Sequence, residues 1–442
     1  MNVKALNAVS LSVRSLAMDA IQKANSGHPG LPLGCAELAA VLYGEIMKHN
    51  PADSRWVDRD RFILSAGHGS MFDYAILHLS GYKVSLKDIR NFRQLGSACA
   101  GHPEYGLTDG VEATTGPLGQ GIAMAVGMAL AETVLAAKFN TAKHKIVDHY
   151  TYTLVGEGCL MEGVSSEASS FAGSMKLGKL IVFYDKNNIT IDGATGGVFG
   201  EDVAERYKAY GWQVLHGSMY DMENIALLTE QAKADERPSL IILDSVIGKG
   251  APTVAGTSKA HGSPLGDAGI AAAKKDLGLP ADKDFYVAPE AYEYFKAKSE
   301  DRAKKENEWK ALFAEWAEEN PELAKEWKRF FAGRPSKKPL MSSYKEGDSL
   351  ATRNASGTAL LELSKVYMNL IGGSADLQGP NCTKLADTTA YSPSSRGGRY
   401  IHFGIREFAM AAIANGIALH GGLRPFCATF LVFADYLRPA LR

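Results

Sequence analysis

The sequence predicts an α/β protein with a doubly wound parallel sheet, followed by an incomplete second α/β domain. Short apolar runs alternate with helical stretches between residues 61 and 246, which is typical of parallel sheets with helical crossovers. The same alternation begins again near residue 351, after a stretch rich in Pro, Lys and Ser. We therefore expect ligands at the carboxyl ends of the strands, where doubly wound sheets bind them.

Length and composition indicate a protein of at least two domains that acts on small molecules. The chain has 442 residues and 46% hydrophobic residues, and its 48 basic and 49 acidic residues leave a formal net charge of -1. That balance favours neither nucleic acid nor a membrane surface as partner. The N-terminus has helical apolar spacing without the continuous apolar run or cleavage site of a signal peptide, and no later stretch is judged long enough to span a bilayer. We therefore expect no targeting or membrane segment. The odd number of scattered cysteines predicts reduced thiols in the cytoplasm rather than disulfides or a zinc cluster. They are Cys35, Cys99, Cys159, Cys382 and Cys427.

Each element of the first domain follows from its apolar spacing. Residues 4–25 carry an apolar stripe at helical spacing, and Gly27 is expected to end that helix. The stripe consists of Leu6, Val9, Val13, Leu16, Ala20 and Ile21. The expected strands are Arg61 to Leu64, Tyr150 to Val155, Leu180 to Tyr184, Gln213 to Leu215 and Leu240 to Val246. Helices are expected near 120–138, 163–176 and 222–235.

The first domain is expected to close with helices and to be followed by a linker. Helices over 298–331 should pack through Trp309, Phe313, Trp316 and Trp327. The predicted boundaries are a first domain at 1–333, a linker at 334–350 and a second domain at 351–442. In the second domain we expect helices at Gly357 to Val366 and Arg406 to His420, and strands near Leu370, at Tyr400 to Phe403 and at Pro425 to Phe430. About 90 residues are few for several parallel crossovers, so we expect a truncated domain.

One pair of strand ends carries the donors of a cation and phosphate site. A strand ending in Gly156-Glu157-Gly158 and a later strand ending before Asn187 would bring a carboxylate and an amide to the same sheet edge. Oxygen donors of this kind suit Mg²⁺ or Ca²⁺, and glycine lets backbone amides approach phosphate. By itself the pattern also fits two tight turns after strands.

Several motifs together resemble the transketolase family. The Gly-Glu-Gly segment followed thirty residues later by Asn187 resembles the thiamine diphosphate motif, in which Asp usually stands where Glu157 does. Five more segments resemble the family in their order along the chain: SGHPG at 26–30, SAGHGS at 65–70, GHPE at 101–104, TTGPLGQG at 114–121 and AHGSPLGD at 260–267. The resemblance covers the whole chain. It implies the thiamine diphosphate-binding fold, with a diphosphate-binding domain at 1–333 and part of a pyrimidine-binding domain at 351–442.

The resemblance implies roles for residues of the first domain. The metal ligands would be Glu157, Asn187 and the main-chain carbonyl of Ile189. The residues that contact the cofactor would be His68, Gly116, Leu118, Gly158, Asn187 and His261. The residues that line the sugar channel, bind substrate and assist proton movement would be His28, His102 and His261. The imidazole N–H groups suit diphosphate and sugar hydroxyls chemically.

The resemblance also implies roles in the second domain. Glu407, in the segment IREFAM, would be the catalytic carboxylate that bonds the pyrimidine ring. Further cofactor contacts would be Asp376, Phe430, Phe433 and Tyr436. Arg353 would hold the sugar phosphate, whereas Pro380 stands where the family usually has a phosphate-binding Ser. Glu162 and Glu167 match carboxylates that link paired active sites across the dimer.

The implied activity is transfer of a two-carbon glycolaldehyde unit from a ketose phosphate to an aldose phosphate, in the pentose phosphate pathway. The resemblance implies thiamine diphosphate with Mg²⁺ or Ca²⁺, and a cytoplasmic homodimer with active sites at the subunit interface. Since the family continues beyond Arg442, we expect a fragment, half of a split enzyme completed by a C-terminal polypeptide, or a noncatalytic cofactor-binding or assembly subunit. We expect the chain alone to bind the cofactor weakly and to transfer ketol groups poorly. Dihydroxyacetone synthase and 1-deoxyxylulose-5-phosphate synthase are alternatives with the same cofactor.

Overall fold

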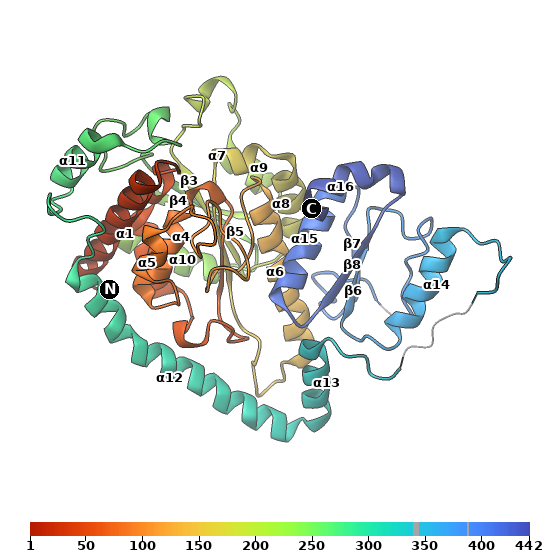
Figure 1. Cartoon of the computed structure of the whole chain (residues 1–442). Helices are drawn as coiled ribbons and strands as arrows, with labels where there is room; N and C mark the ends of the chain where they lie inside the picture. Colours follow the sequence, from red (N-terminus) through yellow and green to blue (C-terminus); the bar gives the residue numbers. More distant parts are fainter. Residues whose placement is uncertain (339–343, 387–388) are drawn as a thin grey trace. The chain divides into compact units, whose positions relative to one another are not determined.

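The computed structural model describes residues 1–338, 344–386 and 389–442, which form two compact units (Figure 1). The first unit comprises residues 1–122, 149–163 and 178–308. The second comprises residues 123–148, 164–177 and 309–442. The units thus interleave along the sequence. The predicted boundaries at 333 and 351 remain predictions, and part of the predicted linker, residues 339–343, lies outside the described residues.

The first unit is built on a five-stranded sheet in which every neighbouring pair of strands is parallel. Its spatial order is β1 (Arg61–Leu64), β2 (Thr151–Gly156), β3 (Leu180–Lys186), β5 (Ser239–Asp244) and β4 (Gln213–Ser218). The four residues of β1 and most of those of β2, β3 and β5 are buried, as expected for apolar strands covered on both faces. The predicted doubly wound α/β class is confirmed, and each predicted strand of this sheet is present with ends shifted by at most a few residues.

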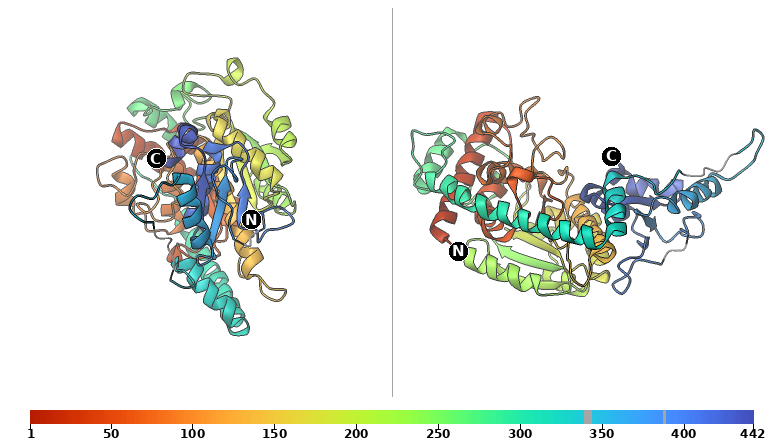
Figure 2. Two further views of the ribbon diagram at one scale, coloured as in Figure 1. Left: turned by 90° about the vertical axis from the view of Figure 1, so that its right-hand side faces the viewer. Right: turned by 90° about the horizontal axis from the view of Figure 1, so that it is seen from below.

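Helices of the same unit surround these strands (Figure 1). They are α1 (Val3–Ala24), α2 (Gly30–Gly34), α3 (Ala36–Val41), α4 (Met71–Ser80), α5 (Leu86–Arg90), α7 (Glu157–Met161), α9 (Val203–Ala209), α10 (Met222–Lys233) and α11 (Gly266–Asp276). Short 3₁₀ or π segments are η1 (Leu42–Ile46), η2 (Pro51–Asp53), η3 (Gly67–Gly69), η4 (Thr195–Gly197) and η5 (Ser258–Ala260). The longest helix, α12 (Pro289–Glu319), is continuous and is drawn in teal in the right-hand view of Figure 2.

Helix α1 buries its predicted apolar stripe but ends differently from the prediction. It stops at Asn25, whose backbone is left-handed with φ 49°. The Asn25 N–H donates to the Gln22 carbonyl at 3.1 Å, and the Ser26 N–H donates to the Ile21 carbonyl at 3.3 Å. Asparagine tolerates this conformation and satisfies the last carbonyls, so the prediction that Gly27 ends the helix was wrong.

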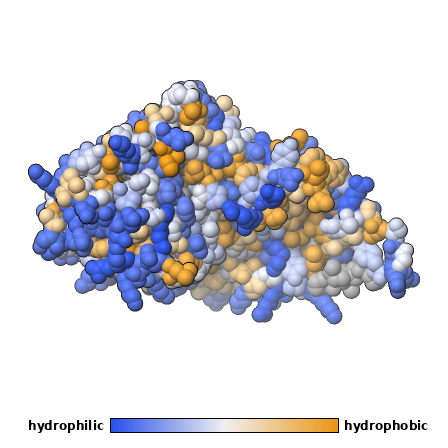
Figure 3. Space-filling model, turned by 45° about the horizontal axis from the view of Figure 1, so that its top comes forward, coloured by the Kyte–Doolittle hydropathy of each residue, from blue (hydrophilic) through white to orange (hydrophobic). Residues whose placement is uncertain are grey.

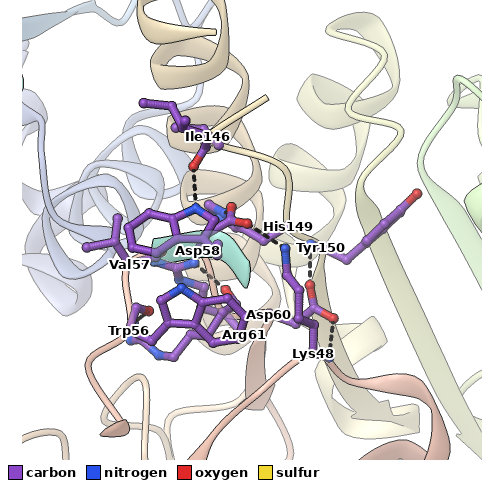
Figure 4. Close-up of polar contacts among 12 residues, drawn as sticks. Lys48, Trp56, Val57, Asp58, Asp60, Arg61, Ile146, His149 and Tyr150 are labelled. Atoms are coloured by element: carbon purple, nitrogen blue, oxygen red, sulfur yellow. Dashed lines mark hydrogen bonds and ion pairs between the residues drawn. The ribbon is translucent and has the colours of Figure 1, made fainter. Parts of the chain in front are cut away.

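A buried polar cluster fixes the amino ends of β1 and β2 (Figure 4). The Asp60 carboxylate accepts hydrogen bonds from the backbone N–H groups of Lys48 and Tyr150, both at 2.8 Å. Asp58 contacts the His149 ring at 2.9 Å and the Lys48 ammonium at 2.5 Å. Because each buried charge has a partner, the cluster stabilises the strand starts, at the sheet edge opposite the strand ends that carry the predicted ligands.

The second unit contains a three-stranded parallel sheet in the order β7 (Tyr400–His402), β6 (Leu370–Ser374) and β8 (Arg424–Ala428). Its further elements are α8 (Gly163–Ser174), α13 (Pro321–Ala332), α14 (Thr352–Ser364), α15 (Glu407–His420), η6 (Leu431–Phe433) and α16 (Ala434–Leu441). Helix α14 begins before the predicted start at Gly357. Gly357 lies inside the helix, where a larger residue would not fit because an added Cβ would be 2.6 Å from the Cys382 carbonyl oxygen.

Two helices of the second unit pack backbone against backbone. A Cβ added at Gly416 of α15 would lie 2.0 Å from the Met124 carbonyl oxygen of α6 (Gln120–Phe139). A Cβ added at Gly127 of α6 would lie 2.1 Å from the Ile413 carbonyl oxygen. Only glycine therefore permits this crossing. The predicted aromatic packing face is also confirmed: Phe313 lies with its ring centroid 5.3 Å from Trp309 and Trp316 and 5.2 Å from Trp327.

Helix α6 is long and apolar enough to cross a membrane. It has 20 residues, and among the described residues it is the one helix that passes this test of length and composition. The prediction that no later stretch is long enough was therefore wrong on length. However, 78% of its apolar window is buried inside the protein, as in the core helix of a soluble protein, so the helix is weak evidence for a membrane span.

All five cysteines are free thiols. Cys35, Cys99 and Cys159 are buried, and burial raises the pKa of each. The prediction that these thiols are reduced stays a prediction.

Candidate cofactor site

The carboxyl ends of three neighbouring strands of the first unit carry the polar residues of this site. His68 lies in η3, a few residues after β1 ends at Leu64. Glu157 directly follows β2, and Asn187 directly follows β3. Because Gly156 pairs in register with Asp185, these strand ends meet at one edge of the sheet. The parallel topology thus brings together three residues that are up to 119 positions apart in the sequence.

Glu157 is a buried carboxylate held by backbone donors. Its Oε1 accepts hydrogen bonds from the N–H groups of Asn187 at 2.8 Å and Asn188 at 2.6 Å. Only 3% of the residue is exposed. Burial and the nearby Asp185 raise the pKa of Glu157 to about 7, although the backbone hydrogen bonds oppose the shift. A cation at this place would compensate the buried negative charge.

Asn187 is held in place by a second buried carboxylate. Its side-chain Nδ2 donates to Asp185 at 2.9 Å, and its Oδ1 accepts from the Ile189 N–H at 2.9 Å. Asp185 also accepts a hydrogen bond from the Ser245 hydroxyl. Sequence reasoning missed Asp185, because in the sequence it looks like an ordinary residue near the end of a buried strand. The signal was its charge within the apolar run LIVFYD.

Four predicted histidines gather in the first unit. The ring centroids of His28 lie 5.2 Å from His68, 5.7 Å from His261 and 6.2 Å from His102, and those of His68 and His261 are 5.0 Å apart. Burial lowers the pKa of all four. Burial and the neighbouring histidines bring the pKa of His68 to about 3, and burial together with Arg93 brings that of His28 to about 4. The cluster is therefore neutral at pH 7 and can donate or accept protons.

Arg93 adds a cation beside this cluster and was not predicted. Its Nη2 lies 3.3 Å from His28 Nδ1, and its Nη1 donates to the Ser26 hydroxyl at 2.7 Å. Arg93 has a left-handed backbone with φ 61°, in the irregular segment that follows α5 and precedes GHPE. No motif pointed to it, because a lone arginine in a loop is usually a solvated surface residue.

A cavity of about 590 Å³ opens between these residues, within the size range of small-molecule sites. Its wall includes His68, Leu118, Glu157, Asn187 and His261. The loop glycines permit close approach: a Cβ at Gly158 would lie 2.8 Å from Leu118 Cδ1, and one at Gly116 would lie 3.1 Å from His102 Cδ2. Ile189 and Glu162 also line the cavity. Most of the predicted residues of the first domain thus line one cavity. His28, His102 and Gly116 are not among its lining residues, although His28 and His102 belong to the histidine cluster beside it.

In the second unit, Glu407 is the first residue of α15 and is buried. Glu167 of α8 lies at the same turn: its Oε2 accepts a hydrogen bond from the Ala409 N–H at 3.0 Å. Burial raises the pKa of Glu167, and the nearby Glu407 adds to this shift. Glu167 is therefore a structural partner of the first turn of α15 rather than a solvated helix residue.

The predicted aromatic residues also gather in the second unit. The ring centroids of Phe430 and Phe433 are 6.3 Å apart, and those of Phe433 and Tyr436 are 6.2 Å apart. Tyr436 is 65% exposed, so these residues do not form an ordinary core. Asp376 is exposed, with φ 57°, just after β6.

Arg353 lies exposed in the first turn of α14. The side-chain Oδ1 of the adjacent Asn354 accepts a hydrogen bond from the Cys382 thiol at 3.5 Å. Because Cys382 is two residues beyond Pro380, this contact brings the loop that contains Pro380 to the start of α14. The loop that contains Pro380 therefore lies near the start of α14, the helix that carries Arg353.

Fold and site together define an α/β ligand-binding protein of the doubly wound class, with buried carboxylates and neutral histidines at the carboxyl edge of its sheet. The family model "Transketolase, thiamine diphosphate binding domain" matches residues 5–335, and the model "Transketolase, pyrimidine binding domain" matches residues 348–442. The chain belongs to the transketolase family.

Individual relatives agree with this assignment. The chain is 62% identical over 447 residues to a transketolase of Treponema pallidum, covering 100% of this chain and 68% of that protein. It is 49% identical to a transketolase of Bacillus subtilis, covering 98% and 65%. The structure of a transketolase from Leishmania mexicana superposes with a TM-score of 0.95 at 42% identity, covering 99% of this chain and 66% of that one. A transketolase from Pichia stipitis in complex with sedoheptulose 7-phosphate gives 0.95 at 41%, with the same coverage. The chain thus spans about two thirds of the length of these relatives.

Proposed function

We propose that this chain carries the cofactor site of an enzyme that transfers a two-carbon glycolaldehyde unit from a ketose phosphate to an aldose phosphate. The observation that carries the proposal is the gathering of four neutral histidines beside a cavity walled by Glu157 and Asn187. The enzyme would work in the pentose phosphate pathway in the cytoplasm. Membership in the transketolase family supports this activity over those of dihydroxyacetone synthase and 1-deoxyxylulose-5-phosphate synthase.

The residues present fit thiamine diphosphate and a divalent cation. Two buried carboxylates, Glu157 and Asp185, stand side by side, and they accept hydrogen bonds from uncharged donors: backbone N–H groups, the Asn187 amide and the Ser245 hydroxyl. This arrangement suits a divalent cation with oxygen ligands. Glu157, Asn187 and the Ile189 carbonyl would hold Mg²⁺ or Ca²⁺. His68, His261 and Gly158 would contact the diphosphate, and Gly116 and Leu118 the aminopyrimidine. When bound, thiamine diphosphate supplies an electron sink for breaking a carbon–carbon bond next to a carbonyl.

The histidines would serve the sugar substrate. Because their pKa values are lowered, His28, His102 and His261 are neutral at pH 7 and can exchange protons with sugar hydroxyl groups. Arg93 orients His28 through its contact with Nδ1. Arg353 would bind the phosphate group, and the relatives solved with sugar phosphates support this substrate class.

Glu407 would bond the pyrimidine ring, with Phe430, Phe433 and Tyr436 stacking on it and Asp376 near the thiazolium. The buried position of Glu407 at the start of α15 supports this role, because a carboxylate shielded from water makes a stronger hydrogen bond. The neighbouring Glu167 fixes the turn on which Glu407 stands.

We further propose a homodimer with active sites at the subunit interface. The second unit exposes apolar side chains on both sides of Glu407 in the sequence: Ile405 is 77% exposed, Leu431 90% and Val432 68%. Figure 3, in which the top of Figure 1 is turned toward the viewer, shows patches of hydrophobic surface in orange. Exposed apolar area of this kind marks interaction surfaces. Glu162 and Glu167 would then link the paired sites.

The experiment is calorimetric titration of the purified chain with thiamine diphosphate in the presence of Mg²⁺. We expect the wild type to bind the cofactor and Asn187→Ala to bind it at least about tenfold more weakly, as is usual when a metal ligand or a residue that supports one is removed. The control Asn7→Ala, on the exposed face of α1, should bind like the wild type. Equal affinity in wild type and Asn187→Ala would contradict the cofactor site.

Activity is tested with a ketose phosphate donor and an aldose phosphate acceptor, by chromatography of the products. The wild-type chain alone is expected to transfer ketol groups at a low rate, and Glu407→Gln should bind the cofactor but lose this residual transfer, since the amide cannot share a proton in the same way. Ketol transfer by Glu407→Gln at the wild-type rate would refute the role of Glu407. Sedimentation velocity of the loaded protein tests the dimer.

A further inference from the structure

A second cluster of metal-ligating side chains lies in the second unit, away from the residues assigned to cofactor or substrate. Among the residues that the structure describes, His144, Glu315 and Glu319 bring one ring nitrogen and two carboxylate oxygens within 4.8 Å of one another. Glu315 and Glu319 are four residues apart on α12, so they share one face of the helix. His144 comes from the loop that follows α6.

His144 is the observation that points to a ligand. Its side chain is 1% exposed, yet its Nε2 has no hydrogen-bond partner among the described residues. This nitrogen faces both carboxylates, at 3.6 Å from Glu315 Oε1 and 3.9 Å from Glu319 Oε2. Both distances are too long for hydrogen bonds. A buried ring nitrogen aimed at two anionic oxygens leaves a place for a cation between them.

The ring is fixed from behind, as the histidine ligands of metals usually are. Thr141 Oγ1 lies 3.3 Å from His144 Nδ1 and accepts a hydrogen bond from the His144 backbone N–H at 3.0 Å. When Nδ1–H donates to that hydroxyl, Nε2 presents its lone pair to the carboxylates. The loop is closed by the Thr141 N–H, which donates to the His144 carbonyl at 2.9 Å.

Helix α12 is equally well anchored at this place. Trp316, next to Glu315, is fully buried. The Trp309 indole N–H donates at 2.9 Å to the carbonyl of Ile146, which is labelled in Figure 4 and belongs to the same loop as His144. The cluster therefore rests on two held backbones, and only the carboxylate ends of Glu315 and Glu319 need to move to meet a metal.

We propose that His144, Glu315 and Glu319 form a binding site for a divalent transition-metal ion with the coordination chemistry of Zn²⁺. Imidazole favours Zn²⁺ and its neighbours over Mg²⁺ or Ca²⁺, and one histidine with two glutamates is a three-ligand set that leaves a fourth position for water. Tetrahedral ligands about 2.0–2.1 Å from zinc stand roughly 3.3–3.4 Å apart. The distances of 3.6 and 3.9 Å from His144 Nε2 to Glu315 and Glu319 are therefore only slightly longer than this spacing, and the two carboxylate oxygens lie within 4.8 Å of each other.

Lys143 occupies the outer side of this cluster in the metal-free chain. Its ammonium contacts Glu315 Oε1 at 2.6 Å and also contacts Glu319. The lysine is 58% exposed and can swing into solvent. Two carboxylates balance the charge of a divalent ion, whereas Lys143 supplies one positive charge, so the metal and the ammonium compete for the same oxygens.

The test is titration of the full, tag-free chain with Zn²⁺ after removal of bound metals, in the presence of saturating thiamine diphosphate and Mg²⁺. We expect one Zn²⁺ per chain, and at least about tenfold weaker binding in Glu315→Gln and Glu319→Gln. The exposed Glu318→Gln on the same helix is the matched control and should bind like the wild type. Lys143→Ala should bind Zn²⁺ more tightly, because the competing cation is removed.

Two outcomes would overturn the site. One is the absence of Zn²⁺ binding, in which case the cluster is a surface ion network only. The other is binding that Glu315→Gln, Glu319→Gln and Lys143→Ala leave unchanged, which would locate the ion elsewhere. Substitution with Co²⁺ gives a further reading, since a four-coordinate site produces visible absorption that His144→Gln should abolish.

Discussion

The side-chain amide of Asn187 donates a hydrogen bond to the carboxylate of Asp185 over 2.9 Å, at the end of the same strand. One face of the Asn187 amide is thereby committed to Asp185, which fixes the direction of its oxygen. Asp185 is 2% exposed and carries no predicted role of its own. It orients a proposed metal ligand from behind, as outer-layer residues of metal sites do.

Asp185→Ala should therefore weaken binding of Mg²⁺ and thiamine diphosphate by about 10- to 100-fold, because Asn187 loses its anchor. Titration calorimetry measures the change. Ser245→Ala, which removes another donor to Asp185 but leaves the contact with Asn187, is the control and should have a much smaller effect. If both variants weaken binding equally, Asp185 does not act through Asn187.

The pKa of Glu157 predicts a pH dependence of cofactor binding. With a pKa of about 7, raised by burial and by Asp185, the free site is partly protonated at neutral pH. A cation requires the carboxylate, so its binding releases a proton and its affinity should fall roughly tenfold per pH unit below 7. Glu157→Gln should bind weakly with a flat profile, whereas Glu157→Asp should keep the slope. A flat wild-type profile between pH 5.5 and 7 would contradict this assignment.

The raised pKa of Glu157 also predicts how the stability of the chain depends on pH. The folded-state pKa of Glu157 lies above its ordinary value of 4.5, so folding binds a proton between these values. This carboxyl stabilises the unligated chain most below pH 4.5 and loses that contribution as the pH rises to 7. Urea unfolding of wild type and Glu157→Gln should therefore converge at low pH and diverge in favour of the variant toward pH 7.

The histidine cluster predicts the opposite trend. Burial lowers the pKa of His68 to about 3 and that of His28 to about 4, against an ordinary value of 6.5. Their contribution to stability is complete above pH 6.5 and is lost as the pH falls toward 4 and 3. Between pH 7.5 and 5, we expect the unfolding free energy of His68→Gln to fall by about 1–2 kcal/mol less than that of the wild type. If urea unfolding shows that the wild type and His68→Gln lose the same unfolding free energy between pH 7.5 and 5, His68 does not titrate in this way.

The contact between α6 and α15 predicts a strong packing effect. An added Cβ in Gly416→Ala would overlap the Met124 carbonyl oxygen, 2.0 Å away, and backbone cannot move aside cheaply. We expect a loss of about 3 kcal/mol or more in unfolding free energy. Gly163→Ala is the matched control, because its added Cβ meets nothing within 4 Å. Thermal or urea unfolding compares the two, and similar stabilities would mean that the helices can separate without cost.

Much of the fold follows from local patterns. Four of the five strands of the first unit, β1, β2, β3 and β5, are mostly buried short runs, as a parallel sheet covered on both faces requires, whereas β4 is partly exposed. Helix ends were less predictable: α1 ends at Asn25 rather than at Gly27, and α14 runs through Gly357. In both cases the deciding contact is a backbone hydrogen bond or a close approach, which residue type alone does not fix.

The proposed site divides in the same way. Motifs with recognisable spacing contain His28, His68, Glu157 and Asn187, so these residues could be predicted from the sequence. Asp185 and Arg93 stand in an apolar strand and in a plain loop, where no motif marks them. Their roles depend on distances of 2.9 Å to Asn187 and 3.3 Å to His28.

Periodicity and local sequence segments were enough to predict the class of fold, the family and the residues of the cofactor motif. The groups that support Asn187 and His28 became apparent only in the folded chain, as did the meeting of His144 with Glu315 and Glu319 across more than 170 positions. The physical reason is that hydrogen bonds and ion sites depend on separations of a few ångströms, and chain topology alone sets these between distant residues.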